Sequence, residues 1–418
     1  MNAVAPARRH LTLALLCVVA ALSYIDRQVL TVLMEAIKTE LVLTDTVLGL
    51  LSGFSFAIFY VFAGFPIARY ADRGDRRLVI ALCVAVWSAA TAACGLAQNA
   101  WHMALARIGV AAGEAGAGPA GYSLATEIYP IDRRVTVISI LLAANSVGLA
   151  AGLALTGWLA TMFNWREVFF IVGIPGLGIA LAVWLLAAEP RRGRGAVAVT
   201  APVIRLGKVF AVMARSTSLR WVAVLLIAVP ITGFGFLIWS PSFFQRVHHL
   251  SVEQTGYWLG LATLMGLVFG NLAAGWLGDR YGKDNPRFNG ALAAGGLLAA
   301  FPFALIFVLA PDVRVSLAAF AVLKFLMTLH LGPIMTLCFA QVPKEMRAMM
   351  SATINMMISL AGIGLGAFLV GRLSDSFQLR YGDQSLRYSL LVICFGLLVG
   401  AVAAFMAART ARPLATQE

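Results

Sequence analysis

The chain has 418 residues, of which 61% are hydrophobic and only 12% are charged. Soluble domains carry about 25% charged residues, so this composition excludes an ordinary soluble enzyme or binding module and indicates a polytopic membrane protein. The net charge of +13 could point to nucleic acid, but the basic residues form no single patch, and we expect no nucleic-acid partner.

Twelve apolar segments are each long enough to cross a hydrocarbon core of about 30 Å. They cover residues 11–34, 47–70, 77–98, 101–127, 135–162, 167–187, 219–244, 254–277, 288–310, 314–341, 348–372 and 387–408. The pattern predicts an all-α membrane protein with twelve transmembrane helices.

The basic residues between these segments predict the orientation of the chain. With the N-terminus inside, 22 Lys and Arg fall in the inside segments and 7 in the outside loops. Because basic loops stay in the cytoplasm, both termini are expected there. The sequence has no Asn-x-Ser/Thr site, which favours a bacterial inner membrane.

The long loop after the sixth segment divides the chain into two halves. It begins with EPRRGRG, a linker composition, and continues with VIRLGKVFAVMAR, where apolar residues recur at helical spacing. Basic residues flank that stretch, which predicts an amphipathic helix on the inner membrane surface. We therefore expect an N-terminal bundle of six helices (1–187), a linker (188–218) and a C-terminal bundle of six helices (219–418).

Two pairs of loop motifs repeat at nearly the same offset. ARYADRGDRR (68–77) is similar to GWLGDRYGKD (275–284), which lies 207 residues further on. YPIDRR (129–134) is similar to VPKEMR (342–347), 213 residues further on. Such a repeat predicts two bundles related by a pseudo-two-fold axis along the membrane normal, with a central cavity between them.

The same loops carry a family resemblance. DR-x-x-R-R (72–77) and G-x-L-G-D-R-Y-G-K resemble the signature loop of the major facilitator superfamily. SYIDRQVL (23–30), RIGVAAGEAG (107–116) and NWREVFFIVGIPG (164–176) resemble its spinster branch. The resemblance implies transport by alternating access. The branch is associated with the export of lysolipids and sphingoid lipids, and proton coupling is proposed for it.

Four charged residues lie well inside the first and fourth segments, away from their ends. Arg107 and Glu114 are seven residues apart, so they share one helix face about 10 Å apart along the axis. A charge in hydrocarbon costs at least about 2.5–3.5 kcal/mol, so each needs a cavity or a partner. We expect Asp26 and Glu114 to couple protons, and Arg27 and Arg107 to line the substrate cavity. Arg107 could instead neutralise Glu114, and static ion pairs between helices are the structural alternative.

The second half has no copy of the Arg107–Glu114 pair, because the positions 213 residues on are Phe320 and Met327. Proton coupling is therefore expected in the first half. Three polar residues in the tenth and eleventh segments are candidate cavity residues: Lys324, His330 and Asn355. For His330 a satisfied buried ring is the alternative, and for Asn355 a hydrogen bond between helices.

The signature loops supply a predicted cytoplasmic gate. The resemblance implies that these loops brace the inner gate when the transporter is open outward. We expect an acid of each loop to face an Arg at the start of a later segment, Asp72 facing Arg347 and Asp279 facing Arg134. With the Arg that follows each acid, the candidates are Asp72, Arg73, Arg134, Asp279, Arg280 and Arg347. The alternative is that these charges only set the topology.

Together these features predict a proton-coupled secondary active transporter of an amphipathic, lysolipid- or sphingoid-like substrate. A small organic anion or a drug is the alternative substrate. The expected partners are the substrate, protons and membrane lipids, and the chain is expected to act as a monomer. No catalytic constellation or nucleotide motif indicates an enzyme or an ATP-driven pump. The five cysteines lie in apolar segments without a CxxC pair, so we expect no cofactor and no metal.

Overall fold

The computed structural model describes residues 5–190, 206–282 and 286–411, and its ordered elements in these ranges are all helices. The chain divides into two compact units. Unit 1 comprises Met1–Val199 with Leu250–Gly260, and unit 2 comprises Thr200–His249 with Leu261–Glu418. The predicted bundle limits, 1–187 and 219–418, remain predictions.

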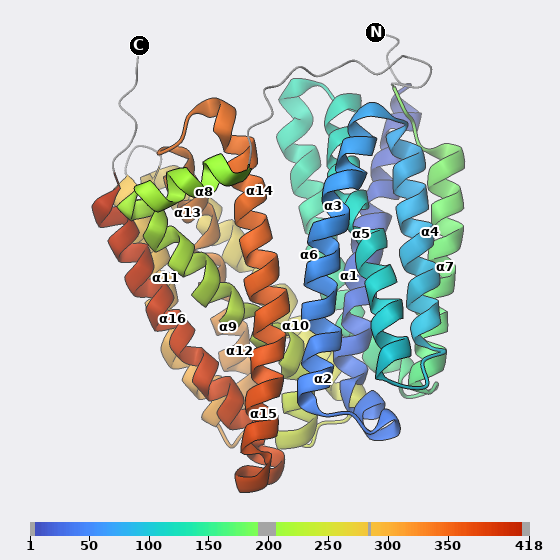
Figure 1. Cartoon of the computed structure of the whole chain (residues 1–418), viewed down its shortest axis with the longest axis vertical. Helices are drawn as coiled ribbons and strands as arrows, with labels where there is room; N and C mark the ends of the chain where they lie inside the picture. The colour runs from blue at the N-terminus through green and yellow to red at the C-terminus, as the bar shows by residue number, and fades with distance from the viewer. Residues whose placement is uncertain (1–4, 191–205, 283–285, 412–418) are drawn as a thin grey trace. The chain divides into compact units, whose positions relative to one another are not determined.

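Unit 1 contains six membrane helices, with a short π-helical turn inside the second (Figure 1). The elements are α1 (Pro6–Leu41), α2 (Asp45–Gly49), η1 (Leu50–Phe54), α3 (Ser55–Arg73), α4 (Arg76–Cys94), α5 (Ala100–Ile128), η2 (Ile131–Arg133), α6 (Arg134–Leu159) and α7 (Trp165–Leu186).

Unit 2 repeats this plan after the surface helix α8. Its elements are α8 (Leu206–Arg215), α9 (Thr217–Val247), α10 (Val252–Leu277, whose first residues group with unit 1), η3 (Gly278–Gly282), α11 (Pro286–Leu309), α12 (Val313–Thr328), α13 (Leu331–Phe339), η4 (Lys344–Met346), α14 (Arg347–Ile358), η5 (Ser359–Gly366), α15 (Ala367–Tyr381), η6 (Gly382–Gln384) and α16 (Ser385–Thr410).

The expected twelve membrane helices are confirmed in the described residues. Ten stretches are long and apolar enough to cross a membrane, and the last of them, Met349–Thr410, contains both α14–α15 and α16. The helix α5 is outside this set because Arg107, Glu114 and several glycines lower its hydropathy. With 29 residues it is nevertheless about 43 Å long, which exceeds the hydrocarbon thickness.

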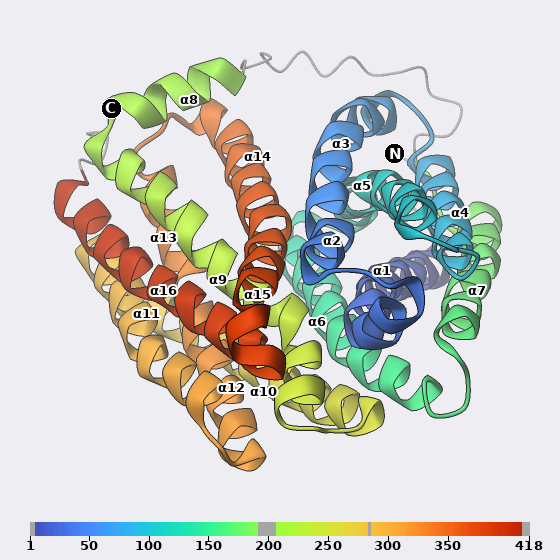
Figure 2. The same ribbon diagram turned by 60° about the horizontal axis from the view of Figure 1, so that its bottom comes forward.

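Equivalent helices pack in the same order in each unit. In unit 1, α1 packs against α6, and α4 packs against both α5 and α7. In unit 2, α9 packs against η5, and α11 packs against both α12 and α16. Figures 1 and 2 show α4 beside α5 and α7, and α16 beside α9 and α11. The sequence repeat therefore corresponds to a repeat of structure.

Two helices extend beyond their apolar segments. The helix α1 continues to Leu41, so Lys38 lies in its last turn and not in a loop. The helix α15 continues to Tyr381, which places Arg372 and Arg380 on a helix as well. The apolar segments that end at residues 34 and 372 are therefore shorter than their helices, because polar helix ends continue outside hydrocarbon, where hydropathy no longer marks them.

The helix α8 is amphipathic, as its sequence predicted. Val209 and Met213 are buried, while Lys208 and Arg215 are exposed. The helix packs on α9 and α14 within unit 2. Residues 191–205 of the linker are outside the described residues.

Gly113 lets α5 approach α4 closely. A Cβ atom built at Gly113 would lie 2.5 Å from the backbone nitrogen of Trp87 and 2.8 Å from its Cβ, whereas one built at Gly118 meets nothing within 4 Å. This close packing fixes α5 against α4 at the residue before Glu114.

We expect Gly113→Ala to destabilise the protein by about 1–3 kcal/mol, because an added methyl overpacks a filled interface. Gly118→Ala on the same helix is the matched control, and it gains the same helix propensity of up to about 1 kcal/mol. Unfolding of the two purified variants in detergent compares them directly. Equal stability would show that α4 and α5 do not pack through Gly113.

Candidate functional site

An ion pair between α1 and α5 forms the centre of the site in unit 1. The Arg27 guanidinium donates from Nε to Glu114 Oε2 at 2.6 Å, and its Nη2 lies 2.5 Å from the same oxygen. Ser23 Oγ donates to this oxygen at 3.0 Å. The Glu114 side chain is completely buried, whereas 21% of the Arg27 side chain is exposed. Charge-assisted bonds of this kind are about twice as strong as neutral ones.

Aromatic rings surround the Arg27 guanidinium. Its Cζ lies 5.1 Å from the ring centre of Tyr24, 4.9 Å from that of Phe56 and 5.4 Å from that of Tyr60. Such rings attract a cation through their negative faces. These contacts are separate from the ion pair with Glu114.

Arg107 is buried close by but is not the partner of Glu114. Its Cζ lies 5.2 Å from the Phe56 ring, and its Nε has no hydrogen-bond partner. In the described part of the chain it forms no ion pair. Arg107 therefore does not form the direct ion pair with Glu114 that was one alternative for it. Two helical turns separate the residues along α5, and Arg27 reaches Glu114 from α1 instead.

Asp26 points from α1 toward α4, away from Arg27. It is 1% exposed, and Thr91 Oγ1 donates to its Oδ2 at 3.4 Å. Its second oxygen, Oδ1, has no hydrogen-bond partner. Neighbouring positions of a helix point about 100° apart, which explains why Asp26 and Arg27 face different helices.

The three candidates in unit 2 occupy different environments. Lys324 is buried on α12, where its Nζ donates to Gly233 O at 3.4 Å and lies 5.1 Å from the Phe320 ring centre. His330, between α12 and α13, bonds through Nδ1 to Met327 O. This bond fits the alternative of a satisfied buried histidine. Asn355 is exposed on α14. Their roles in binding substrate remain predictions.

The predicted gate residues are mostly on the surface of their units. Asp279 and Arg280 are exposed in η3, and Arg134 and Arg347 are exposed at the first residues of α6 and α14. No ion pair joins these four in the residues described. The side chains of Asp72 and Arg73 are outside the described residues. The expected gate contacts would join the two units, so they remain predictions.

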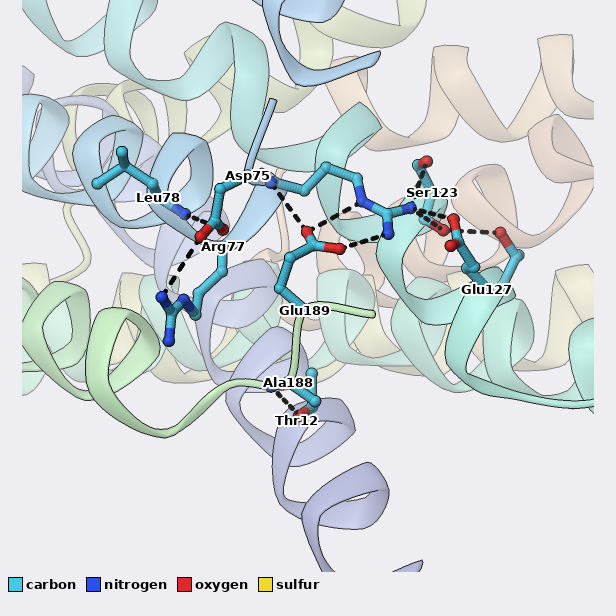
Figure 3. Close-up of polar contacts among 10 residues, drawn as sticks. Thr12, Asp75, Arg77, Leu78, Ser123, Glu127, Ala188 and Glu189 are labelled. Atoms are coloured by element: carbon cyan, nitrogen blue, oxygen red, sulfur yellow. Dashed lines mark hydrogen bonds and ion pairs between the residues drawn. The ribbon is translucent and has the colours of Figure 1, made fainter. Parts of the chain in front are cut away.

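A second polar network was missed by sequence reasoning. Arg76, at the start of α4, has a completely buried side chain between two acids. Its Nη2 lies 2.8 Å from Glu189 Oε1, and its Nη1 lies 2.8 Å from Glu127 Oε2. Its backbone N–H also donates to Glu189 at 2.9 Å, and Nη1 donates to Ser123 Oγ at 3.1 Å. Figure 3 shows Glu189 on one side of the network, with Ser123 and Glu127 on the other.

This network ties four membrane helices together at one end of unit 1. Glu189 follows α7, Glu127 ends α5, and the neighbouring Ala188 N–H donates to Thr12 of α1 at 2.9 Å (Figure 3). The sequence contained a signal, since Glu189 is the single acid in a linker that is otherwise apolar or basic, and Glu127 ends an apolar segment. Arg76 itself was predicted only to help set the topology.

The stretch NWREV forms a clamp at the other end of unit 1. Trp165 Nε1 donates to Glu40 Oε2 at 2.5 Å, and Arg166 Nη1 lies 2.9 Å from Glu40 Oε1. Arg166 Nη2 also donates to Ala97 O at 2.9 Å. These bonds join the end of α1 to the start of α7 and to the loop before α5.

Comparisons with known proteins cover both units. The family model described as Major Facilitator Superfamily matches residues 16–367. An MFS-type efflux pump of Mycolicibacterium smegmatis is 31% identical over 403 residues, which are 96% of this chain and 93% of the relative. A probable L-galactonate transporter of Escherichia coli is 28% identical over 282 residues, 65% of this chain and 60% of the relative.

A solved structure supports the same comparison. The inward-facing, unoccupied crystal structure of a bacterial homologue of the human lysosomal transporter Spinster superposes with a TM-score of 0.86. It is 28% identical in sequence, and the match covers 98% of each chain. The resemblance to the spinster branch that the motifs indicated is confirmed.

Proposed function

Because this chain belongs to the Major Facilitator Superfamily, we propose that it is a proton-coupled secondary transporter of an amphipathic solute that works by alternating access. The coupling carboxyls are Asp26 and Glu114. The solute is lysolipid-like or sphingoid-like, and its polar head is recognised near Arg107. The observation that carries the proposal is the Arg27–Glu114 ion pair, placed next to a buried Asp26 and a buried, unpaired Arg107 inside a membrane helix bundle.

The ion pair gives a physical means of coupling. When Glu114 binds a proton it loses its charge, and the attraction that holds Arg27 is lost with it. Arg27 is retained by the rings of Tyr24, Phe56 and Tyr60, and the exposed part of its guanidinium can then face another anion. Because an unpaired charge in hydrocarbon is costly, proton binding and substrate binding at Arg27 favour one another.

Arg107 supports recognition of an anionic head. It is 3% exposed and has a donor without an acceptor. Burying a charge without a partner costs several kcal/mol, so such a cation is a strong site for an anion. A guanidinium fork fits phosphate and carboxylate groups equally well.

A small organic anion is the second candidate substrate. The unpaired Arg107 favours it, because a carboxylate satisfies the guanidinium without any lipid tail. The similarity to a transporter named for L-galactonate supports the same class.

Transport into liposomes tests the proposal and separates the two substrates. Purified protein is reconstituted with a pH-sensitive dye trapped inside, and a pH gradient is imposed. Lysophosphatidate, sphingosine and L-galactonate serve as three probes. Proton movement that accompanies a lipid probe supports the first proposal, and proton movement only with L-galactonate supports the second. If a probe is transported at the same rate with and without the pH gradient, proton coupling is contradicted.

Arg107→Gln is expected to reduce transport of an anionic probe by about 10-fold or more, because a hydrogen bond to a charged group contributes about 1.5–3 kcal/mol. Transport of cationic sphingosine should change much less. Arg107→Lys is the matched variant, since it keeps the charge and loses the fork, and its loss should be intermediate. Unchanged lysophosphatidate and L-galactonate transport in Arg107→Gln excludes Arg107 as the anion site.

A further inference from the structure

Four buried polar atoms without partners belong to side chains of one region of unit 1. They are Asp26 Oδ1 on α1, Trp87 Nε1 on α4, and Arg107 Nε and Glu114 Oε1 on α5. Asp26 interacts electrostatically with both Glu114 and Arg107, and the Trp87 indole is close to its carboxyl without reaching hydrogen-bond geometry. The backbone of Trp87 packs against Gly113, the residue before Glu114.

Four such atoms in one region favour a bound molecule that forms hydrogen bonds with them. Each buried polar group left without a partner costs about 1–3 kcal/mol. The set is balanced, with two acceptors on the carboxylates and two N–H donors on Trp87 and Arg107. Water matches it, because one molecule both donates and accepts and usually makes about three hydrogen bonds in a protein.

The charges in this region favour a neutral resident group when both carboxyls are ionised and no substrate is bound. The guanidinium groups of Arg27 and Arg107 then balance the carboxylates of Asp26 and Glu114, so neither a cation nor an anion is favoured. A proton shared by the carboxyls leaves a net positive charge, which is the state that attracts the anionic head of a substrate to Arg107.

We propose that these groups enclose a hydrated chamber inside unit 1, whose water joins Asp26 to Glu114 so that the two carboxyls share one proton. The proposal deepens the proposed transport function and rests on it for its role. In the transfer step the Asp26 O–H bond breaks and its proton passes to a water molecule. That water passes one of its own protons to Glu114 Oε1, which leaves Asp26 as the carboxylate.

Thr91 is the positioning residue of this chamber. Its hydroxyl donates to Asp26 Oδ2 at 3.4 Å, which leaves Oδ1 as the carboxyl oxygen without a partner. Ser88 is on the same helix, but its hydroxyl points elsewhere, since a Cβ built at Gly176 of α7 would collide with it. The charged or titratable groups that face the two carboxyls are Arg27, Arg107, Cys94 and Tyr60.

Infrared difference spectroscopy of the full-length protein in liposomes, without substrate, tests the chamber. A pH step is applied in ordinary water and in water labelled with ¹⁸O. Wild type and Ser88→Ala should show O–H bands that shift with the label, and Asp26→Asn should lose them. Label-sensitive bands that persist unchanged in Asp26→Asn overturn the chamber.

The carboxylic C=O bands test the shared proton and the role of Thr91. The Glu114 band, identified by its loss in Glu114→Gln, should change in frequency in Asp26→Asn, because this variant removes the carboxyl that shares its proton. A Glu114 band of unchanged frequency overturns the shared proton. Thr91→Val should shift the Asp26 band, and Thr91→Ser should restore it. If Thr91→Val and Thr91→Ser show the same Asp26 band, the Thr91 hydroxyl does not position Asp26.

These readings do not depend on transport. A protein that shows the coupled bands but no proton-driven uptake retains the chamber and loses the proposed function. Proton-driven uptake without coupled bands supports the proposed function and contradicts the chamber.

Discussion

Glu114→Gln is expected to abolish transport driven by a pH gradient while the protein still folds. Glutamine keeps the shape of the side chain and can still accept from Arg27 and Ser23, whose bonds to Glu114 Oε2 are 2.6 and 3.0 Å long. It cannot bind and release a proton, so the charge that holds Arg27 no longer changes. The fold should survive because Arg27 keeps three aromatic neighbours.

Two measurements in liposomes check this result. Uptake driven by a proton gradient should fall to the level of empty liposomes. Exchange of labelled for unlabelled probe at equal pH, which moves no net protons, should continue. Asp132→Asn, which changes an exposed acid of η2, is the control and should transport normally. Uptake driven by the proton gradient at the wild-type level in Glu114→Gln would show that Glu114 is not a coupling carboxyl.

Glu189→Gln is expected to lower the free energy of unfolding by about 3 kcal/mol. The Arg76 and Glu189 side chains are both 0% exposed, and removing one partner of a buried pair costs about 3–5 kcal/mol because the other charge is left uncompensated. The loss should be at the lower end of this range, since Glu127 remains 2.8 Å from Arg76 Nη1. Denaturant unfolding of the purified variant measures it.

A surface pair provides the control for this prediction. Glu40 is 53% exposed where it pairs with Arg166, and exposed pairs contribute at most about 1 kcal/mol. Glu40→Gln should therefore cost much less than Glu189→Gln. The double variant Arg76→Leu with Glu189→Leu should recover part of the loss, because it leaves no buried charge unpaired. Equal losses for Glu40→Gln and Glu189→Gln contradict a buried network.

The candidate site was partly predictable. Asp26, Arg27, Arg107 and Glu114 were identifiable because a charge within an apolar segment is costly and needs a cavity or a partner. Their pairing was not identifiable. Spacing on α5 suggested Arg107 as the partner of Glu114, but spacing within one helix contains no information about which neighbouring helix supplies a competing guanidinium.

The Arg76 network is a second case in which the sequence did not reveal a contact between helices. In the sequence, Arg76 is one of many basic residues at the ends of apolar segments, where most such residues are exposed. Its burial depends on Glu189, which is 113 residues further on and follows another helix. Only the packing of α4 against α5 and α7 brings the two acids to it.

The twelve apolar segments are sufficient to predict the membrane helices, their approximate limits and the repeat of two halves. Each helix satisfies its own backbone in hydrocarbon, so its presence is a local property of an apolar segment. The contacts between helices are visible only in the folded chain: Glu114 pairs with Arg27, 87 residues away, Arg107 has no ion-pair partner among the described residues, and Asp26 faces Thr91. These contacts follow from which helices pack side by side and at what rotation, and side chains on several distant segments set that packing together.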